Sequence, residues 1–214
     1  MFPALAATTA VAMAVLVWAE WKHSKIRLIA KPLASAGFVA AALQRGAFDS
    51  TYGRILLLGL VLAAIGDVLL LGSTRRMFLA GLVSFLLGHV AYGVAFSTLG
   101  LRHGTDIDFI WTAAVSLPIA AVSYVVFRWL KPHLSDDMRS PVLAYVLVIT
   151  VMVLTAFFAV EGGATGLILV GAVGFFLSDL AVARNLVVES ITNRVWGLPL
   201  YYAAQLVLAW TAGT

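Results

Sequence analysis

The chain has 214 residues, of which 62% are hydrophobic and only 11% are charged, and its mean hydropathy is +1.01. A soluble domain of this length cannot bury so many apolar side chains, so lipid must be the solvent for most of them. A formal net charge of +4 would suggest a nucleic-acid partner only in a soluble protein, and the absence of cysteine excludes disulfides and a thiol nucleophile. The composition therefore predicts an integral membrane protein that contacts membrane lipids and binds no nucleic acid.

Eight apolar runs, each close to the length that crosses a bilayer, follow one another along the chain. They are expected at residues 2–19, 26–44, 53–72, 77–99, 108–130, 140–160, 164–188 and 195–212. The loops between them are short and lack the composition of a domain linker, and backbone groups in lipid must be satisfied within the protein. We therefore predict an all-α membrane protein with one domain, residues 1–214, built as a single bundle of about eight transmembrane helices.

Basic residues gather in every second loop. The first, third, fifth and seventh loops and their flanking helix ends carry Lys22, Lys25, Arg27, Arg75, Arg76, Arg128, Lys131, Arg139 and Arg194, whereas the others carry only Arg45, Arg54 and Arg102. Because cytoplasmic loops are enriched in lysine and arginine, the odd loops are predicted to be cytoplasmic and both termini to lie on the other side. The inner membrane of a bacterium is the expected location, because the protein is compact and no targeting segment is evident.

Two aspartates interrupt otherwise apolar runs. Asp67 lies in LVLAAIGDVLLLGS (60–73) and Asp179 in GAVGFFLSDLAVA (171–183). At a rise of about 1.5 Å per residue, they lie about 7 Å and about 13 Å from the cytoplasmic ends of their helices. A carboxylate at this depth is costly and marks a functional site by default, although an interhelical ion pair with Lys31 or Arg184 is the structural alternative.

Most other polar side chains within the runs share the cytoplasmic half or the centre of the bilayer with the aspartates. They are Lys31, His89, Tyr92, Ser178, Asn185, Tyr202 and Gln205. Glu20 and Arg184 lie near the same membrane face and are interpreted first as an interfacial residue and a cytoplasmic anchor. The outer half of the bundle is almost purely apolar, so the pattern predicts one polar cavity that opens toward the cytoplasmic leaflet.

The two halves of the chain carry polar residues in a similar order and spacing. In the first half His89 follows Asp67 by 22 residues, and in the second half Tyr202 follows Asp179 by 23 residues. Each half holds an even number of runs, so a repeat would be parallel, with its axis along the membrane normal. Such a repeat places both aspartates on the same side of the membrane, facing one another across the axis.

Five segments, in this order and spacing, resemble the YhhN-like lysoplasmalogenase family. They are KPL (31–33), GDVLLL (66–71), FLAGLVSFLLGHVAYGVAF (78–96), FFLSDLAVARN (175–185) and LYYAAQL (200–206). The resemblance implies hydrolysis of the vinyl-ether bond of a lysoplasmalogen to a fatty aldehyde and glycerophosphoethanolamine or glycerophosphocholine. Asn185 departs from the pattern, because an aromatic residue is expected at that position.

Vinyl-ether chemistry suits a pair of buried carboxyl groups. Hydrolysis begins with protonation of the β-carbon and passes through an oxocarbenium ion, so the acid must keep its proton at neutral pH. Apolar surroundings and a second carboxylate nearby both favour a protonated carboxyl group. One of Asp67 and Asp179 is predicted to donate the proton, while the other stabilises the cation and orients or deprotonates the water, a division of labour like that of glycosidases.

The remaining polar residues are predicted to bind the substrate. Lys31 and the basic cytoplasmic loops would hold the lipid phosphate. His89, Tyr92, Tyr202 and Gln205 would complete the hydrogen-bond network around the water, with Ser178 and Asn185 as further substrate-binding residues.

Other mechanisms and functions fit the sequence less well. Of the four histidines only His89 lies within a predicted span, so no metal site and no cofactor are expected. A proton-coupled transporter of small molecules or lipids is the alternative from another class, since repeats and buried acids suit a carrier, but a carrier needs polar residues leading to both faces. A non-catalytic lipid-binding protein is the third possibility, and it predicts that both aspartates tolerate replacement by asparagine.

Overall fold

Eight α-helices account for most of residues 2–100 and 109–214, the part of the chain that the computed structural model describes. They are α1 (Phe2–Trp21), α2 (Arg27–Gln44), α3 (Thr51–Leu69), α4 (Arg75–Gly100), α5 (Phe109–Leu130), α6 (Asp136–Glu161), α7 (Leu167–Val187) and α8 (Ile191–Thr211), with a short 3₁₀ turn, η2 (Lys131–His133), between α5 and α6. The described residues contain no strand, so the prediction of an all-α bundle is confirmed. Residue 108, where one predicted run begins, and Arg102 lie outside the described residues.

Within the described residues six helices, namely α1, α3, α4, α5, α6 and α7, are long and apolar enough to cross a membrane. Their outward faces carry large exposed apolar side chains such as Leu58, Leu117 and Leu147, as expected of a surface in lipid. The chain is therefore an integral multi-pass membrane protein. Helices α2 and α8 are similar in length but carry polar residues such as Lys31 and Gln205, which are buried inside the bundle. That these two helices also span the bilayer stays a prediction.

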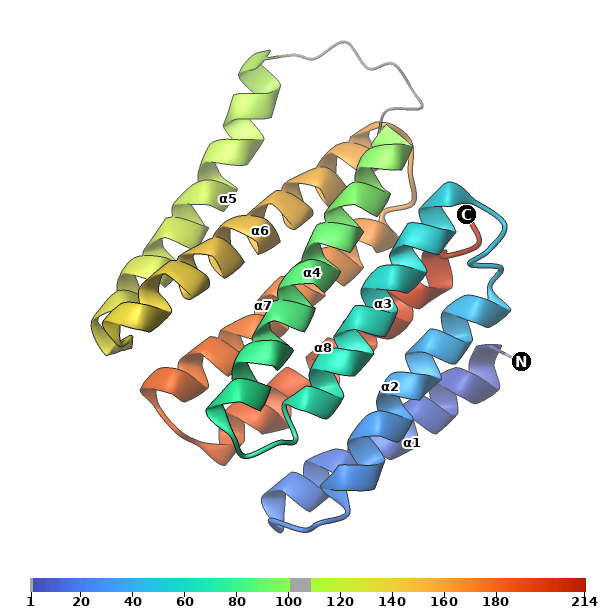
Figure 1. Ribbon diagram of the computed structural model, residues 1–214. Helices are drawn as coiled ribbons and strands as arrows, with labels where there is room; N and C mark the ends of the chain where they lie inside the picture. Colours follow the sequence, from blue (N-terminus) through green and yellow to red (C-terminus); the bar gives the residue numbers. More distant parts are fainter. Residues whose placement is uncertain (1, 101–108) are drawn as a thin grey trace.

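The packing of the helices follows the predicted parallel repeat. Helix α3 packs extensively along α4, and α7 packs in the same way along α8, four helices later. Between the halves, α4 contacts α6, and the equivalent helices α8 and α2 are also in contact. Helix α1 breaks the pattern because it packs on both α2 and α8, whereas α5 lies at the edge of the bundle against α6 (Figure 1).

The close approach of α3 and α4 depends on glycine. A Cβ atom added at Gly59 would collide with the ring of Tyr92, and one added at Gly66 would lie 2.7 Å from the ring of Phe85. Small residues at helix crossings allow close backbone approach in membrane proteins, where van der Waals contact drives association. The crossing fixes the position of Asp67, which directly follows Gly66.

The connections α1–α2, α3–α4, α5–α6 and α7–α8 all lie at one end of the bundle, and both termini lie at the other end (Figure 1). We call the first end the basic end because it carries Lys22, Lys25, Arg27, Arg75, Arg76, Arg128, Lys131, Arg139 and Arg194. An ion pair between Arg75 and Asp137 joins two of these connections. This arrangement agrees with the charge pattern of the sequence, and the cytoplasmic orientation of the basic end stays a prediction.

Candidate active site

A cavity of about 340 Å³ lies toward the basic end, between the two halves of the bundle. Most of its wall is apolar, but both Asp67 and Asp179 line it. Its outer part is formed by the last turn of α1 and the first turns of α2 and α8. The structure therefore contains a cavity shared by both aspartates, but its wall is mainly apolar, whereas the sequence predicted a polar cavity.

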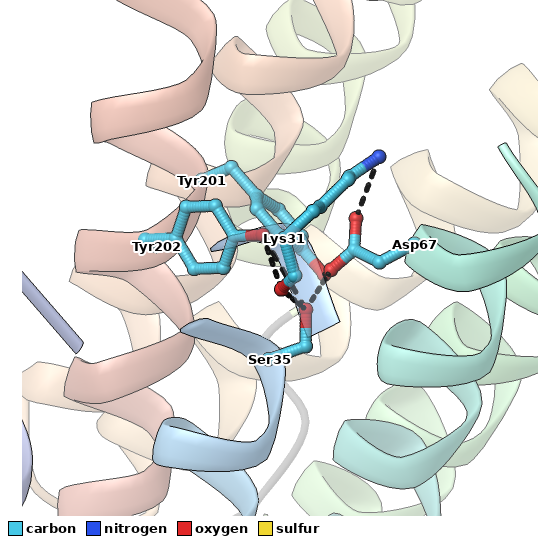
Figure 2. A network of polar contacts seen from close by, with 5 residues as sticks. All are labelled: Lys31, Ser35, Asp67, Tyr201 and Tyr202. Carbon is cyan, nitrogen blue, oxygen red and sulfur yellow. Dashed lines mark hydrogen bonds and ion pairs between the residues drawn. The ribbon is translucent and has the colours of Figure 1, made fainter. Parts of the chain in front are cut away.

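Asp67 is held by three donors from two other helices (Figure 2). The Nζ atom of Lys31 lies 3.2 Å from Oδ1. The hydroxyls of Ser35 and Tyr201 donate to Oδ2 at 2.6 Å and 2.8 Å. The hydroxyl of Tyr202 lies 3.4 Å from Ser35 Oγ and donates to the carbonyl oxygen of Lys31 at 3.4 Å. An ammonium and two hydroxyl donors satisfy an ionised carboxylate, so this group of contacts stabilises Asp67 as the anion.

The spacing of residues along α2 explains why two of the donors to Asp67 come from this helix. Lys31 and Ser35 are four residues apart, which places them one above the other on the same helix face. That face packs against α3 and α8, which carry Asp67 and Tyr201. The ion pair of Lys31 with Asp67 is the structural alternative that the sequence left open, but both side chains also line the cavity.

Asp179 has different neighbours. The hydroxyl of Tyr145, on α6, donates to Oδ2 at 2.7 Å, and Nε2 of His89, on α4, lies 3.5 Å from the same oxygen. Nδ1 of His89 lies 2.7 Å from the carbonyl oxygen of Phe85. A carbonyl only accepts, so Nδ1 carries a hydrogen and Nε2 of a neutral ring is an acceptor. Nε2 has no hydrogen-bond partner among the described residues, so at 3.5 Å it is a close neighbour of Asp179 Oδ2 and is not hydrogen-bonded to it.

The two aspartates occupy equivalent places in the repeat. Asp67 on α3 receives donors from α2 and α8, and Asp179 on α7 has its neighbours on α6 and α4, which are the corresponding helices. The chemistry differs because Lys31 supplies a fixed positive charge beside Asp67, while Asp179 faces a tyrosine and a histidine. The side chain of Asp179 is also more accessible, at 17% exposed against 3% for Asp67.

Five of the residues predicted from sequence line the cavity, namely Lys31, Asp67, Ser178, Asp179 and Asn185. The hydroxyl of Ser178 donates to the carbonyl of Phe175 at 2.7 Å, so it is satisfied within its own helix. Asn185 accepts a hydrogen bond from Asn193 Nδ2 at 3.2 Å. These two residues therefore shape the wall, and the hydrogen bond of Asn185 joins α7 to α8.

Tyr92 and Gln205, which were also predicted from the sequence, do not line the cavity. The hydroxyl of Tyr92 donates to Gln205 Oε1 at 2.6 Å, and both side chains are fully buried between α4 and α8. The residues that line the cavity include neither of them, nor His89 and Tyr202, which lie behind the aspartates. Tyr92 and Gln205 thus form an interhelical hydrogen bond that joins the two halves.

Sequence reasoning did not identify Ser35, Tyr145 and Tyr201. Ser35 follows Lys31 by one helical turn, and that spacing was the available signal. Tyr201 directly precedes Tyr202, but only its direction in the folded bundle brings its hydroxyl to Asp67. Tyr145 lies in a run that offers nothing except hydrophobicity, so its role depends entirely on the packing of α6 against α7.

Residues 26–212 match the model of the YhhN family. The chain belongs to the YhhN family. The match covers α2 to α8 and thus includes both aspartates and all the donors that surround them.

Named relatives agree with this membership. The chain is 31% identical over 163 residues to lysoplasmalogenase TMEM86A of Bos taurus, which covers 72% of this chain and 63% of that protein. It is 32% identical over 164 residues to lysoplasmalogenase of Mycobacterium bovis, which covers 75% of this chain and 60% of that protein. The chain therefore spans about three fifths of the length of these curated relatives. No solved structure matches this YhhN family member significantly.

Proposed function

We propose that the chain is a lysoplasmalogenase-type hydrolase, which cleaves the vinyl-ether bond of a lysoplasmalogen to a fatty aldehyde and a glycerophospho-alcohol. The observation that carries this proposal is the pair of carboxyl groups on one cavity, one beside a lysine and the other beside a tyrosine and a histidine. An acid that holds a proton and an anion that stabilises a cation are the two groups that this hydrolysis needs. The printed names of the relatives, lysoplasmalogenase, support the same reaction.

In the first step Asp179 acts as the acid. It transfers its proton to the β-carbon of the vinyl ether, the carbon–carbon double bond is consumed, and the ether oxygen shares the positive charge that develops at the α-carbon. Asp179 suits this role because it is the more accessible of the two carboxyl groups and because Tyr145 holds it in place beside His89. After the transfer it is a carboxylate beside the cation.

Asp67 stays ionised throughout. Its negative charge stabilises the oxocarbenium ion, and this stabilisation is greatest at the transition state, when the charge develops. Lys31, Ser35 and Tyr201 fix the carboxylate before the reaction, so little reorganisation is needed. Tyr201 also lines the cavity and is a positioning residue on the substrate side of Asp67.

Water then completes the reaction. A water molecule forms a bond to the α-carbon and gives up one proton to the Asp179 carboxylate, which restores the acid and leaves a hemiacetal. The hemiacetal collapses when its carbon–oxygen bond to glycerol breaks and its hydroxyl proton passes to the departing glycerol oxygen. The balance is one water consumed, one aldehyde and one alcohol released, and no net proton.

The apolar wall of the cavity suits the hydrocarbon chain of such a substrate. Val142, Val146 and Ile149 contribute one side from α6, and Leu82 and Phe85 contribute another from α4. A transporter, the alternative from another class, needs access from both faces, and the cavity that contains the aspartates lies toward the basic end alone. We therefore prefer the hydrolase, and we place its basic end in the cytoplasm on the strength of the positive-inside rule.

The test measures free aldehyde from alkenyl-lysophosphatidylethanolamine with the protein purified in detergent. Asp67→Asn and Asp179→Asn are compared with wild type and with Asp136→Asn, a matched control at the exposed start of α6. We expect wild type and the control to release aldehyde and both site variants to lose at least about a hundredfold in rate. No aldehyde from folded wild type would refute the proposed function, and retained activity in either site variant would refute its mechanism.

A further inference from the structure

Three charged residues stand at the outer part of the cavity and take no part in the proposed chemistry. Glu20 lies in the last turn of α1, Arg27 begins α2, and Arg194 lies in the first turn of α8, and all three line the cavity. The carboxylate of Glu20 is buried and contacts both guanidinium groups. Arg194 pairs closely with its Oε2, and Nη1 of Arg27 lies 3.7 Å from the same oxygen.

This cluster carries a surplus positive charge. Two guanidinium groups face a single carboxylate, and each arginine has five N–H donors, of which Glu20 can accept only a few. The side chains of Arg27 and Arg194 are 40% and 44% exposed, so their remaining donors are accessible at the cavity mouth. Paired arginine forks of this kind match the geometry of a phosphate group.

A second, independent observation lies next to Arg194. Asn193 is 1% exposed and lines the same cavity. Its Nδ2 donates to the carbonyl of Val188 at 2.7 Å and to Asn185 Oδ1 at 3.2 Å, which fixes the orientation of the amide. Its Oδ1 then remains a buried acceptor with no hydrogen-bond partner among the described residues. Such an atom is expected to meet a donor, because an unpaired buried acceptor is destabilising.

We propose that Arg27, Arg194 and Asn193 form a headgroup subsite for a lysophospholipid: the two guanidinium groups bind its phosphate, and Asn193 Oδ1 accepts a hydrogen bond from its free glycerol hydroxyl. The identity of the lipid rests on the proposed function. A lipid acylated at that hydroxyl has no proton to donate and leaves Asn193 unpaired, so the subsite selects single-chain lipids. Glu20 holds the two arginines in place when no phosphate is bound.

The distribution of charge along the cavity agrees with a lipid that binds with its headgroup at the mouth. The mouth has a net positive charge and suits the phosphate, while the interior has two carboxyl groups and one lysine and suits the cation formed deeper in the lipid. The substrate therefore enters with its headgroup at the basic end and its chain among the apolar residues of α4 and α6. The same polarity favours the anionic leaflet surface as the route of entry.

The test uses a ligand that cannot be cleaved. Binding of 1-O-alkyl-lysophosphatidylethanolamine, whose ether is saturated, is measured by titration calorimetry in detergent for wild type, Arg27→Gln and Arg194→Gln. Arg139→Gln is the matched control, because its side chain lies at the same end and is also 44% exposed but does not line the cavity. We expect Kd to rise about tenfold to a hundredfold in each site variant and to stay unchanged in the control.

Three further ligands show whether the phosphate, the glycerol hydroxyl or the alkyl chain is responsible for the binding. An alkylglycerol without phosphate should bind wild type and the arginine variants equally, and the 2-O-methyl form of the lysolipid should bind wild type about tenfold more weakly than the parent. Equal losses for the alkylglycerol, or full affinity of the methylated lipid, would overturn the subsite. Inorganic phosphate that binds as tightly as the lysolipid would also overturn it, because the cluster would then be a site for free phosphate.

These outcomes are distinct from the failure of the proposed function. Wild type that binds the lysolipid through Arg27 and Arg194 but releases no aldehyde from the alkenyl substrate would leave the subsite intact and refute the hydrolase. Aldehyde release with an unchanged KM in both arginine variants would support the hydrolase and refute the headgroup subsite.

Discussion

The ion pair between Lys31 and Asp67 offers the sharpest quantitative test of the structure. Replacing Lys31 by methionine keeps an unbranched side chain one atom shorter and removes its charge, which leaves the 3% exposed Asp67 carboxylate with two hydroxyl donors and no cation. Breaking a buried pair by removing one partner destabilises a protein by about 3–5 kcal/mol. Since Ser35 and Tyr201 still donate to Asp67, we expect a loss near the lower end, about 3 kcal/mol.

The assay is thermal unfolding in detergent. For a chain of this size a loss of about 3 kcal/mol corresponds to a fall in Tm of about 6–12 °C. The double variant Lys31→Met with Asp67→Asn should recover most of the loss, because no uncompensated charge then remains in the bundle. A single variant as stable as wild type, or a double variant no more stable than the single one, would refute the reasoning that the pair is electrostatically coupled.

Three other predictions test the site, the packing and the topology. Tyr145→Phe removes one donor to Asp179 and should lower kcat for aldehyde release about tenfold with KM unchanged, whereas Tyr124→Phe on the exposed face of α5 should match wild type. Gly59→Ala should destabilise the α3–α4 crossing by about 1–3 kcal/mol in the same unfolding assay, and Gly166→Ala, with no atom within 4 Å of the added Cβ, should not. A cysteine introduced at Lys22 of this cysteine-free chain should react with a membrane-impermeant maleimide only when the cytoplasmic face is exposed.

Each of these has a clear contrary result. A reduced activity in both tyrosine variants would mean that hydroxyl loss acts through general destabilisation. Equal unfolding temperatures for the two glycine variants would mean that the α3–α4 crossing has room for a methyl group beside Tyr92. Labelling of the introduced cysteine in intact cells would reverse the topology.

The helical bundle was predictable because lipid imposes a simple rule on the sequence. Apolar runs of bilayer length identify the helices, and the charge of the loops identifies the basic end. Helices α2 and α8 fit that rule less well, because polar residues such as Lys31 and Gln205 lower their hydropathy. Both of these side chains are buried inside the bundle. The departure from a simple apolar run therefore marks side chains that face the interior of the bundle, of which Lys31 lines the cavity and Gln205 does not.

The site itself was predictable only in part. An aspartate in an apolar run is conspicuous, so Asp67 and Asp179 were found, and the structure places both on one cavity. A tyrosine in such a run is not conspicuous, because its ring alone explains it, and Tyr145 was missed for this reason. Tyr92 and Gln205 are equally polar in sequence but bind each other, since helix rotation and not residue type decides which side chains reach the cavity.

The crossed arrangement of the donors has a consequence for how the two halves of the chain depend on each other. Asp67 is held by α2 of its own half and by α8 of the other, and Asp179 by α6 of its own half and by α4 of the other. Neither half alone contains a complete set of neighbours for either carboxyl group. If the chain were cut between α4 and α5, Asp67 and Asp179 would regain their full sets of neighbours only when the two fragments reassemble. The two halves therefore form the candidate active site in the same step in which they pack against each other.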